Sequence, residues 1–168
     1  MQPASRVCVM GVSGAGKTVV GTLLAGALAV AFLEGDALHP PENVQRMAQG
    51  IPLTDDDRRG WLAAIAARFA EARRTNTGLV VSCSALKRAY RDVLRNADAG
   101  VQFVHLTGDP AVIRQRISQR AGHYMPASLL DSQLATLEVP GFEEHAWTYN
   151  VADAPASIVR GIVERLNA

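Results

Sequence analysis

The sequence contains few cysteines, few lysines and almost no excess of either charge. Its two cysteines, Cys8 and Cys83, form no C-x-x-C pair and lie in apolar, strand-like runs, so we expect buried free thiols in a cytoplasmic protein. Seventeen Lys and Arg against sixteen Asp and Glu leave a net charge of +1. That balance argues against a protein that grips nucleic acid over a broad surface, but a small anionic substrate is compatible with it.

Residues 18–33 contain no charged side chain. This run is shorter than the ~20 residues that a membrane span needs, and Lys17 stands where the apolar core of a signal peptide would begin. It is therefore predicted to be a buried helix followed by a short strand, with no membrane partner. At 168 residues and 48% hydrophobic composition, the chain fits one domain over residues 1–168.

Lysine occurs at two positions only, Lys17 and Lys87, whereas arginine supplies the other fifteen basic residues. Both lysines are therefore candidates for a chemical requirement. Lys17 belongs to an octapeptide that fits the phosphate-binding P-loop pattern G-x-x-x-x-G-K-[ST]. Its members are Gly11, Val12, Ser13, Gly14, Ala15, Gly16, Lys17 and Thr18.

Each part of that octapeptide suits the binding of a polyphosphate. The glycines let successive backbone N–H groups turn inward, Lys17 reaches the outer phosphates, and the Thr18 hydroxyl can ligate Mg²⁺. A helix that begins at Thr18 adds the positive end of its dipole. The alternative, a glycine-rich turn that binds nothing, is disfavoured because an apolar strand precedes the loop and a helix follows it.

Apolar strands alternate with helical patterns along the chain. Strands are expected at residues 7–10, 31–36, 79–83, 101–106 and 147–151, and helices at 18–30, 41–47, 54–74, 84–95, from 109, at 127–138 and at 155–166. Thr54 and Asp57 have the spacing of a capping box, residues 55–57 are expected to serve helix capping, and Ser84 is predicted to cap the helix that follows it. Parallel strands need such crossovers, so the predicted fold class is a three-layer α/β sheet with about five parallel strands.

In such sheets ligands lie beyond the carboxyl ends of the strands, and this rule gathers the P-loop, Asp36, residues 84–87 and residues 107–109 on one rim. Asp36 can orient or deprotonate an acceptor hydroxyl there, although it can also be a turn residue after Gly35. His39 either bonds a polyol or merely precedes the proline turn.

Several arginines are further candidates. Lys87 and Arg91, one helical turn apart, can grip an anionic substrate or a transferring phosphate, whereas Arg88 and Arg95 are expected in solvated ion pairs. Arg58 can also turn toward the substrate.

Arg116 and Arg120 precede a glycine-containing break and can close over a nucleotide, one stacking on the base and one on phosphate; the alternative is an exposed helix face. The chain has no N-K-x-D segment, which a GTPase needs, and no apolar run that ends in Asp-Glu, which a P-loop motor would carry. Magnesium is therefore expected on Thr18, phosphates and water, with Asp36 behind them.

Five segments together resemble the small P-loop gluconokinases. They are G-V-S-G-A-G-K-T at 11–18, E-G-D-A-L-H-P at 34–40, P-L-T-D-D-D-R at 52–58, C-S-A-L-K-R-A-Y-R-D at 83–92 and the Arg-rich stretch at 116–124 that ends in G-H-Y. The match covers nearly the whole chain, and the second and fourth segments are far more specific than the P-loop alone.

This resemblance implies ATP-dependent phosphorylation of D-gluconate at its 6-hydroxyl, with Mg²⁺, on a P-loop kinase fold like that of the shikimate and nucleoside monophosphate kinases. It also implies a small helical lid at about 116–138, frequent homodimers, and Pro155 beside the adenine. Together the patterns and the resemblance predict catalytic roles for Lys17, Asp36, Lys87 and Arg120. They predict substrate contacts from Asp36, His39, Arg58, Ser84, Lys87, Arg91 and His123.

Two other functions are compatible with the motifs. One is a kinase for a different small hydroxyl acceptor, such as shikimate or a nucleotide. The other is a non-catalytic ATP-binding domain, in which Asp36 and Lys87 would have no evident task.

Overall fold

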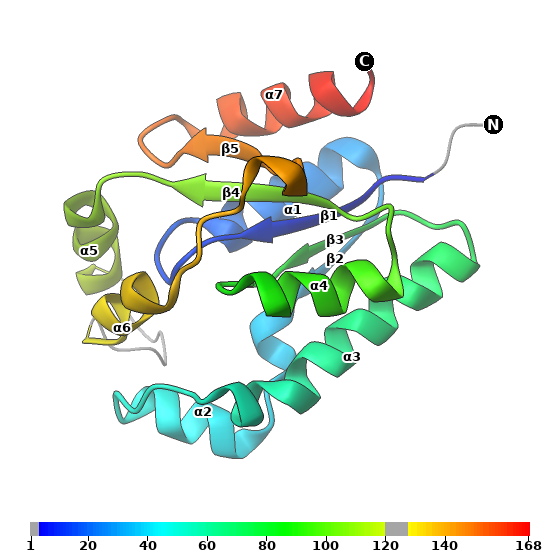
Figure 1. The fold of residues 1–168 in the computed structure, drawn as a ribbon. Coiled ribbons are helices and arrows are strands. Elements are labelled where there is room, and N and C mark those ends of the chain that lie inside the picture. The colour runs from blue at the N-terminus through cyan, green and yellow to red at the C-terminus, as the bar shows by residue number, and fades with distance from the viewer. Residues whose placement is uncertain (1–3, 120–127) are drawn as a thin grey trace.

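The computed structural model describes residues 4–119 and 128–168, and its centre is a five-stranded parallel sheet (Figure 1). The strands are β1 (Arg6–Met10), β2 (Ala31–Glu34), β3 (Leu79–Ser82), β4 (Gln102–Thr107) and β5 (Trp147–Asn150). Their order across the sheet is β2-β3-β1-β4-β5, and every neighbouring pair is parallel. The predicted sheet of five parallel strands is confirmed.

Strand β1 lies in the middle of the sheet and is buried on both faces. Cys8 pairs in register with Val81 of β3 and with Phe103 of β4. The four residues from Val7 to Met10 have no exposed surface, which explains why this strand is an unbroken apolar run. Cys8 and Cys83 are both buried free thiols, as expected.

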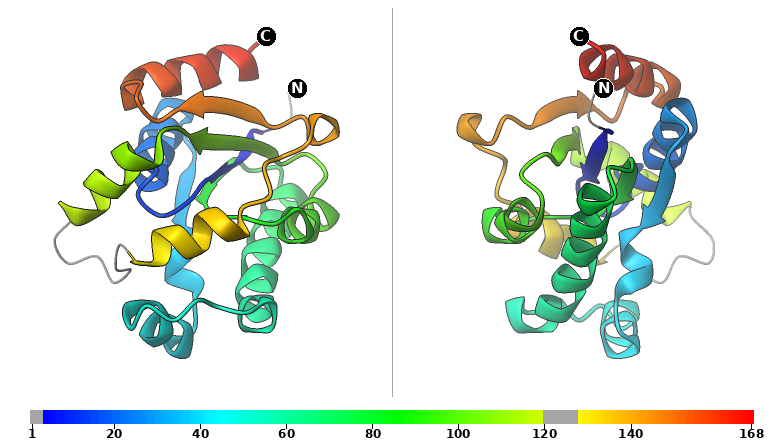
Figure 2. Two further views of the ribbon diagram at one scale, coloured as in Figure 1. Left: turned by 60° about the vertical axis from the view of Figure 1, so that its left-hand side comes forward. Right: turned by 90° about the vertical axis from the view of Figure 1, so that its right-hand side faces the viewer.

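Helices cover both faces of the sheet (Figures 1 and 2). On one face α1 (Lys17–Leu28) packs against α7 (Pro155–Leu166), and on the other α3 (Asp55–Arg74) packs against α4 (Arg88–Ala97). Trp61, Ile65 and Phe69 of α3 are almost fully buried, as their helical spacing predicts. The three-layer α/β architecture is therefore confirmed.

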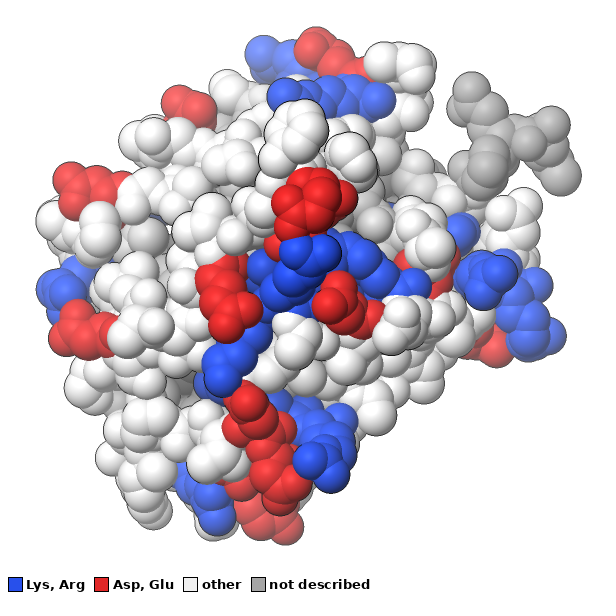
Figure 3. Space-filling view, viewed as in Figure 1, with Lys and Arg blue, Asp and Glu red and all other residues white. Residues whose placement is uncertain are grey.

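The shorter elements are the 3₁₀ turn η1 (Gly35–Leu38), α2 (Pro41–Ala48), α5 (Pro110–Ser118), α6 (Ser128–Thr136) and the 3₁₀ turn η2 (Phe142–Glu144). Helices α5 and α6 lie beyond the end of the sheet toward which the strand arrows point (Figure 1). Within the described ranges, every helix is too short or too polar to cross a membrane. On the face drawn in Figure 3, basic and acidic side chains interleave and form no broad patch of one sign.

Two local predictions are wrong. The helix expected from Ser84 begins only at Arg88, with Lys87 as its N-cap residue, because the preceding Ala85 takes a left-handed conformation with φ of 46°. The strand expected to reach Asp36 ends at Glu34, and Asp36 lies in η1 instead. There the indole Nε1 of Trp61 donates a hydrogen bond to the carbonyl of Gly35 at 2.8 Å, which ties η1 to helix α3.

The predicted capping box at the start of α3 is confirmed. Thr54 Oγ1 accepts a hydrogen bond from the N–H of Asp57 at 3.1 Å, and Asp57 Oδ2 accepts one from the N–H of Thr54 at 2.9 Å. Two backbone N–H groups that lack a helical partner are thereby satisfied. Helix α3 thus has a defined start, and its first turn carries Asp55 and Arg58.

We expect Thr54→Ala to lower the free energy of unfolding by about 1 kcal/mol, because it removes the acceptor for the Asp57 N–H. Urea denaturation measures the change. The control is Thr22→Ala, the same substitution at an exposed position inside α1, where the higher helix propensity of alanine predicts no loss. Equal losses in both variants would contradict a capping role.

Candidate active site

The P-loop connects the end of β1 to the first turn of α1. Gly14 and Gly16 have φ angles of 82° and 95°, a region that residues with a side chain rarely adopt. Gly16 is the N-cap residue of α1, which begins at Lys17. The loop therefore presents backbone N–H groups and a helix N-terminus to the same space, as phosphate binding requires.

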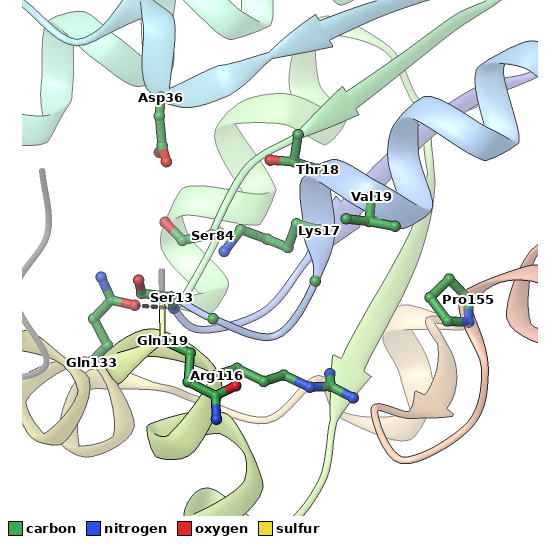
Figure 4. Close-up of a pocket in the computed structure, with 12 residues that line it drawn as sticks. Ser13, Lys17, Thr18, Val19, Asp36, Ser84, Arg116, Gln119, Gln133 and Pro155 are labelled. Carbon is green, nitrogen blue, oxygen red and sulfur yellow. Dashed lines mark hydrogen bonds between the residues drawn. The ribbon is translucent and has the colours of Figure 1, made fainter. Parts of the chain in front are cut away.

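A cavity of about 390 Å³ lies against this loop, within the size range of small-molecule sites (Figure 4). It brings together predicted nucleotide-binding residues and predicted acceptor residues from five separate segments. Its lining consists of Ser13, Gly14, Gly16, Lys17, Thr18, Val19, Asp36, Ser84, Arg116, Gln119, Gln133 and Pro155.

Asp36 reaches the cavity from η1, whose first residue, Gly35, packs closely against the end of β3. A side chain at Gly35 would come within 2.1 Å of the Ser82 carbonyl oxygen, so only glycine fits there. The carboxylate of Asp36 extends toward the side of the cavity on which Lys17 and Ser84 lie (Figure 4). A carboxylate and a phosphate-binding ammonium thus line one space, which is the arrangement that in-line phosphoryl transfer needs.

Glu34 is a site residue that the sequence analysis missed. Its carboxylate accepts hydrogen bonds from the Thr18 hydroxyl and, at 2.5 Å, from the Ser82 hydroxyl. The signal was available, because Glu34 is a carboxylate at the carboxyl end of β2, two residues before Asp36. Among residues 4–119 and 128–168, no group of three or more His, Cys, Asp or Glu can hold a metal ion. The oxygen donors of Thr18 and Glu34 suit Mg²⁺, which keeps water and phosphate ligands and takes few from protein.

His39 does not line the cavity. Its ring stacks on Trp61 with centroids 4.1 Å apart, and its Nδ1 lies 3.2 Å from the side-chain nitrogen of Asn43. Burial, followed by the nearby charge of Arg58, lowers the pKa of His39 to about 4. The imidazole is therefore neutral at physiological pH, and its packing role is the one that these contacts support.

Asp55, Arg58, Lys87 and Tyr90 form a second polar group, which we call the acceptor-side cluster. Lys87 Nζ lies 2.9 Å from Asp55 Oδ1, the Tyr90 hydroxyl donates to the same oxygen, and Arg58 Nη1 donates to the Tyr90 hydroxyl at 2.8 Å. The hydrogen bond to Asp55 raises the pKa of Lys87, which stays cationic. Capping was the only role expected for Asp55, because no local pattern reveals its contact with Tyr90 across 35 residues.

Arg91 does not occupy the place that its sequence pattern suggested. Its side chain is fully buried and pairs with Glu144, with Nε and Oε1 2.7 Å apart. A guanidinium in that position is closed off from solvent and does not line the cavity, so the expected substrate contact is wrong for this structure. Arg95 also differs, since it bonds Glu144 at 2.6 Å as well as Asp92 at 3.0 Å and is only partly solvated.

The nucleotide side of the cavity includes Arg116, whose Nη2 donates to the Val151 carbonyl at 2.8 Å. Two glutamines that the sequence did not single out also line the cavity. Gln119 follows Arg116 along the chain, and Gln133 of α6 accepts a hydrogen bond from the N–H of Ser13 at 2.6 Å. Arg120 and His123 lie outside the described residues.

Comparison with known proteins identifies sequences that are similar to this chain. A family model described as an AAA domain matches residues 7–140. The gluconokinase of Gluconobacter oxydans is 48% identical over 160 residues, which cover 95% of this chain and 90% of that protein. The sequence resemblance thus extends over the segments that form the cavity and the acceptor-side cluster.

Comparison with solved structures likewise finds similar kinases. A gluconokinase from Sinorhizobium meliloti is 53% identical with a TM-score of 0.83, covering 94% of this chain and 88% of that one. An unliganded sugar kinase from Janibacter is 44% identical with a TM-score of 0.93, covering 98% and 95%. A shikimate kinase from Bacteroides thetaiotaomicron, at 20% identity, has a TM-score of 0.70 and covers 98% and 99%, which confirms the shared fold.

We expect the free energy of unfolding to fall as the pH drops from about 6.5 to about 4, because His39 is neutral when folded while the unfolded chain takes up its proton. This contribution is fully present above the unfolded pKa and is lost as pH falls through the folded pKa. His39→Gln should reduce the slope by up to about 1.4 kcal/mol per pH unit. Urea denaturation across this pH range measures the slope for the wild type and for the variant. The buried His105 titrates similarly in both proteins, so unchanged slopes would contradict the assignment to His39.

Proposed function

Because the chain belongs to the gluconokinase family of P-loop kinases, we propose that it transfers the γ-phosphoryl group of ATP to the 6-hydroxyl of D-gluconate, giving 6-phospho-D-gluconate and ADP. One observation supports this reaction above the others. Lys17, on the phosphate loop, and Asp36, in the η1 turn that follows β2, line one cavity of a size that suits small ligands.

The residues divide into a donor half and an acceptor half. The P-loop N–H groups and Lys17 hold the phosphates of ATP, while Arg116 and Pro155 flank the space for the base. Asp36 orients the acceptor hydroxyl and takes up its proton as the new O–P bond forms. When bound, Mg²⁺ neutralises phosphate charge; Thr18 would hold it, with Glu34 behind.

The acceptor-side cluster suits an acid. Arg58 and Lys87 contribute two positive charges and Asp55 one negative charge, so the cluster carries one unbalanced positive charge that a carboxylate can neutralise. The other two acids of this turn have arginine partners of their own, since Asp56 pairs with Arg59 and Asp57 with Arg46. An aldonate therefore fits this side better than an uncharged sugar.

Three further assignments are part of the proposal. The lid is placed at about 116–138, of which residues 120–127 lie outside the described ranges; α6 within it contacts the P-loop, where Gln133 accepts a hydrogen bond from the N–H of Ser13. The protein acts in the cytoplasm. It forms a homodimer, for which the exposed apolar side chains of Val139 and Phe142, 70% and 94% accessible, offer contact surface.

An ADP-release assay with a panel of acceptors tests the function. We expect kcat/KM with D-gluconate to exceed that with shikimate or a nucleoside monophosphate by at least about a hundredfold, because a site built for specific polar groups rejects ligands that lack them. ATP binding without ADP release from any acceptor would favour the non-catalytic alternative. Preference for shikimate or a nucleotide would instead identify a kinase with another substrate.

Asp36→Asn should separate binding from transfer, because it keeps the shape of the side chain but removes the proton acceptor. We expect MgATP affinity within a few fold of wild type and phosphate transfer at least ~100-fold slower. Calorimetry with a non-hydrolysable ATP analogue and an assay for 6-phosphogluconate measure the two. The control is Asp56→Asn, whose carboxylate is 84% exposed and pairs with Arg59 at the surface. Unchanged transfer in the Asp36 variant would refute its role as base.

A further inference from the structure

Every N–H of the buried Arg91 guanidinium has a protein acceptor. Nε and Nη2 donate to the two carboxylate oxygens of Glu144 at 2.7 and 3.1 Å. Nη1 donates to the carbonyls of Ala85 and Leu86 at 2.8 and 3.3 Å, and Nη2 also donates to the carbonyl of Glu138 at 2.9 Å. An arginine has five N–H donors in a rigid fork, so these five bonds use all of them.

Two of those bonds hold segment 84–87, which joins β3 to α4 and lies between the two halves of the site. Ser84 lines the cavity, and its carbonyl accepts a hydrogen bond from the N–H of Gly11, the first P-loop residue, at 3.4 Å. Lys87, at the other end, belongs to the acceptor-side cluster. Between them Ala85 has φ of 46°, which a residue other than glycine adopts only at a cost. The path of this segment therefore depends on contacts from outside it.

The segment that follows α6 supplies the remaining contacts. The N–H of Glu138 donates to the Leu86 carbonyl at 2.7 Å, and its carboxylate accepts from the N–H of Arg88 at 3.0 Å. Glu144 is 2% exposed; burial alone would raise its pKa, but hydrogen bonds from Arg91, Arg95 and a backbone N–H lower the pKa to about 2. The carboxylate is therefore charged at all working pH values.

We propose that Arg91, held by Glu144, is a positioning residue for the acceptor. By clamping the Ala85 and Leu86 carbonyls it sets Ser84 and Lys87 at the distance from the P-loop that in-line transfer to gluconate requires. This inference rests on the proposed function, because it assigns segment 84–87 to the acceptor half of that site. Arg91 itself does not touch the substrate.

Energetics favour position over stability as the reason for this pair. A buried ion pair contributes little net stability compared with well-packed apolar side chains, because both charges lose their hydration. A guanidinium can hold two adjacent carbonyls and a carboxylate at once, which neither an apolar residue nor the ammonium of a lysine can do. The forked geometry of the Arg91 guanidinium is therefore the property that this site requires.

The test compares Arg91→Lys and Glu144→Gln with the control Arg95→Gln. Arg95 Nη2 donates to the same Glu144 oxygen at 2.6 Å, but within the described structure it makes no hydrogen bond to segment 84–87. We expect Arg91→Lys to raise KM for gluconate at least about tenfold and to lower kcat, with KM for ATP within about twofold. Glu144→Gln should shift the same constants in the same direction by less, and Arg95→Gln should leave them unchanged.

Circular dichroism at the assay temperature establishes that each variant is folded, and thermal denaturation ranks their stabilities. A purely structural role predicts losses of active protein in proportion to stability, with unchanged KM values, and that result would overturn the proposal. So would an equal rise in both KM values. If Arg91→Lys does not fold, Glu144→Gln decides, since an unchanged KM for gluconate in that variant refutes positioning. Wild-type protein that does not phosphorylate gluconate would refute the proposed function instead.

Discussion

All five strands run in one direction, and the rest of the site depends on that constraint. Because the strands are parallel, each ends at the same edge of the sheet, and each must be followed by a crossover that leaves this edge. The P-loop after β1, Glu34 at the end of β2 and Ser84 after β3 therefore meet although they are far apart in the chain. Adjacency of β1 and β3 in the sheet brings the Ser84 carbonyl to the N–H of Gly11.

The charged side chains around the site fall into two groups, one open to the cavity or to solvent and one buried. Lys17 and the acceptor-side cluster present cations to a cavity or to solvent, where an anionic ligand can reach them. Arg91 and Glu144 are instead buried. They form an ion pair with each other, and Arg91 also donates hydrogen bonds to backbone carbonyls. Arg91, four residues after Lys87 in the sequence, thus bonds the backbone of segment 84–87 and does not itself line the cavity.

Features with a local cause could be predicted from sequence. The P-loop needs glycines at positions of positive φ, the capping box needs Thr54 and Asp57 three residues apart, and a doubly covered strand needs an apolar run such as Val7–Met10. Predictions from the sequence failed where the local structure or a side-chain contact depends on a residue from another element. Ser84 has the chemistry of an N-cap, but Arg91 and Glu138 hold the next carbonyls outside a helix, so α4 begins later. Glu34 and Gln133 were missed because their partners, Thr18 and Ser13, lie on another element.

The sequence by itself determined the fold class, the phosphate loop and the family, because periodicity, glycine spacing and ordered motifs are properties of neighbouring residues. Tertiary structure alone decided which charged side chains line the cavity or stay near solvent and which are buried. Lys87, the N-cap residue of α4, and Arg91, in its first turn, lie four residues apart and have the same charge, yet one is near solvent and the other is buried. The difference arises because segment 137–144 packs over Arg91 and supplies Glu144, a contact across 53 residues that no local pattern records.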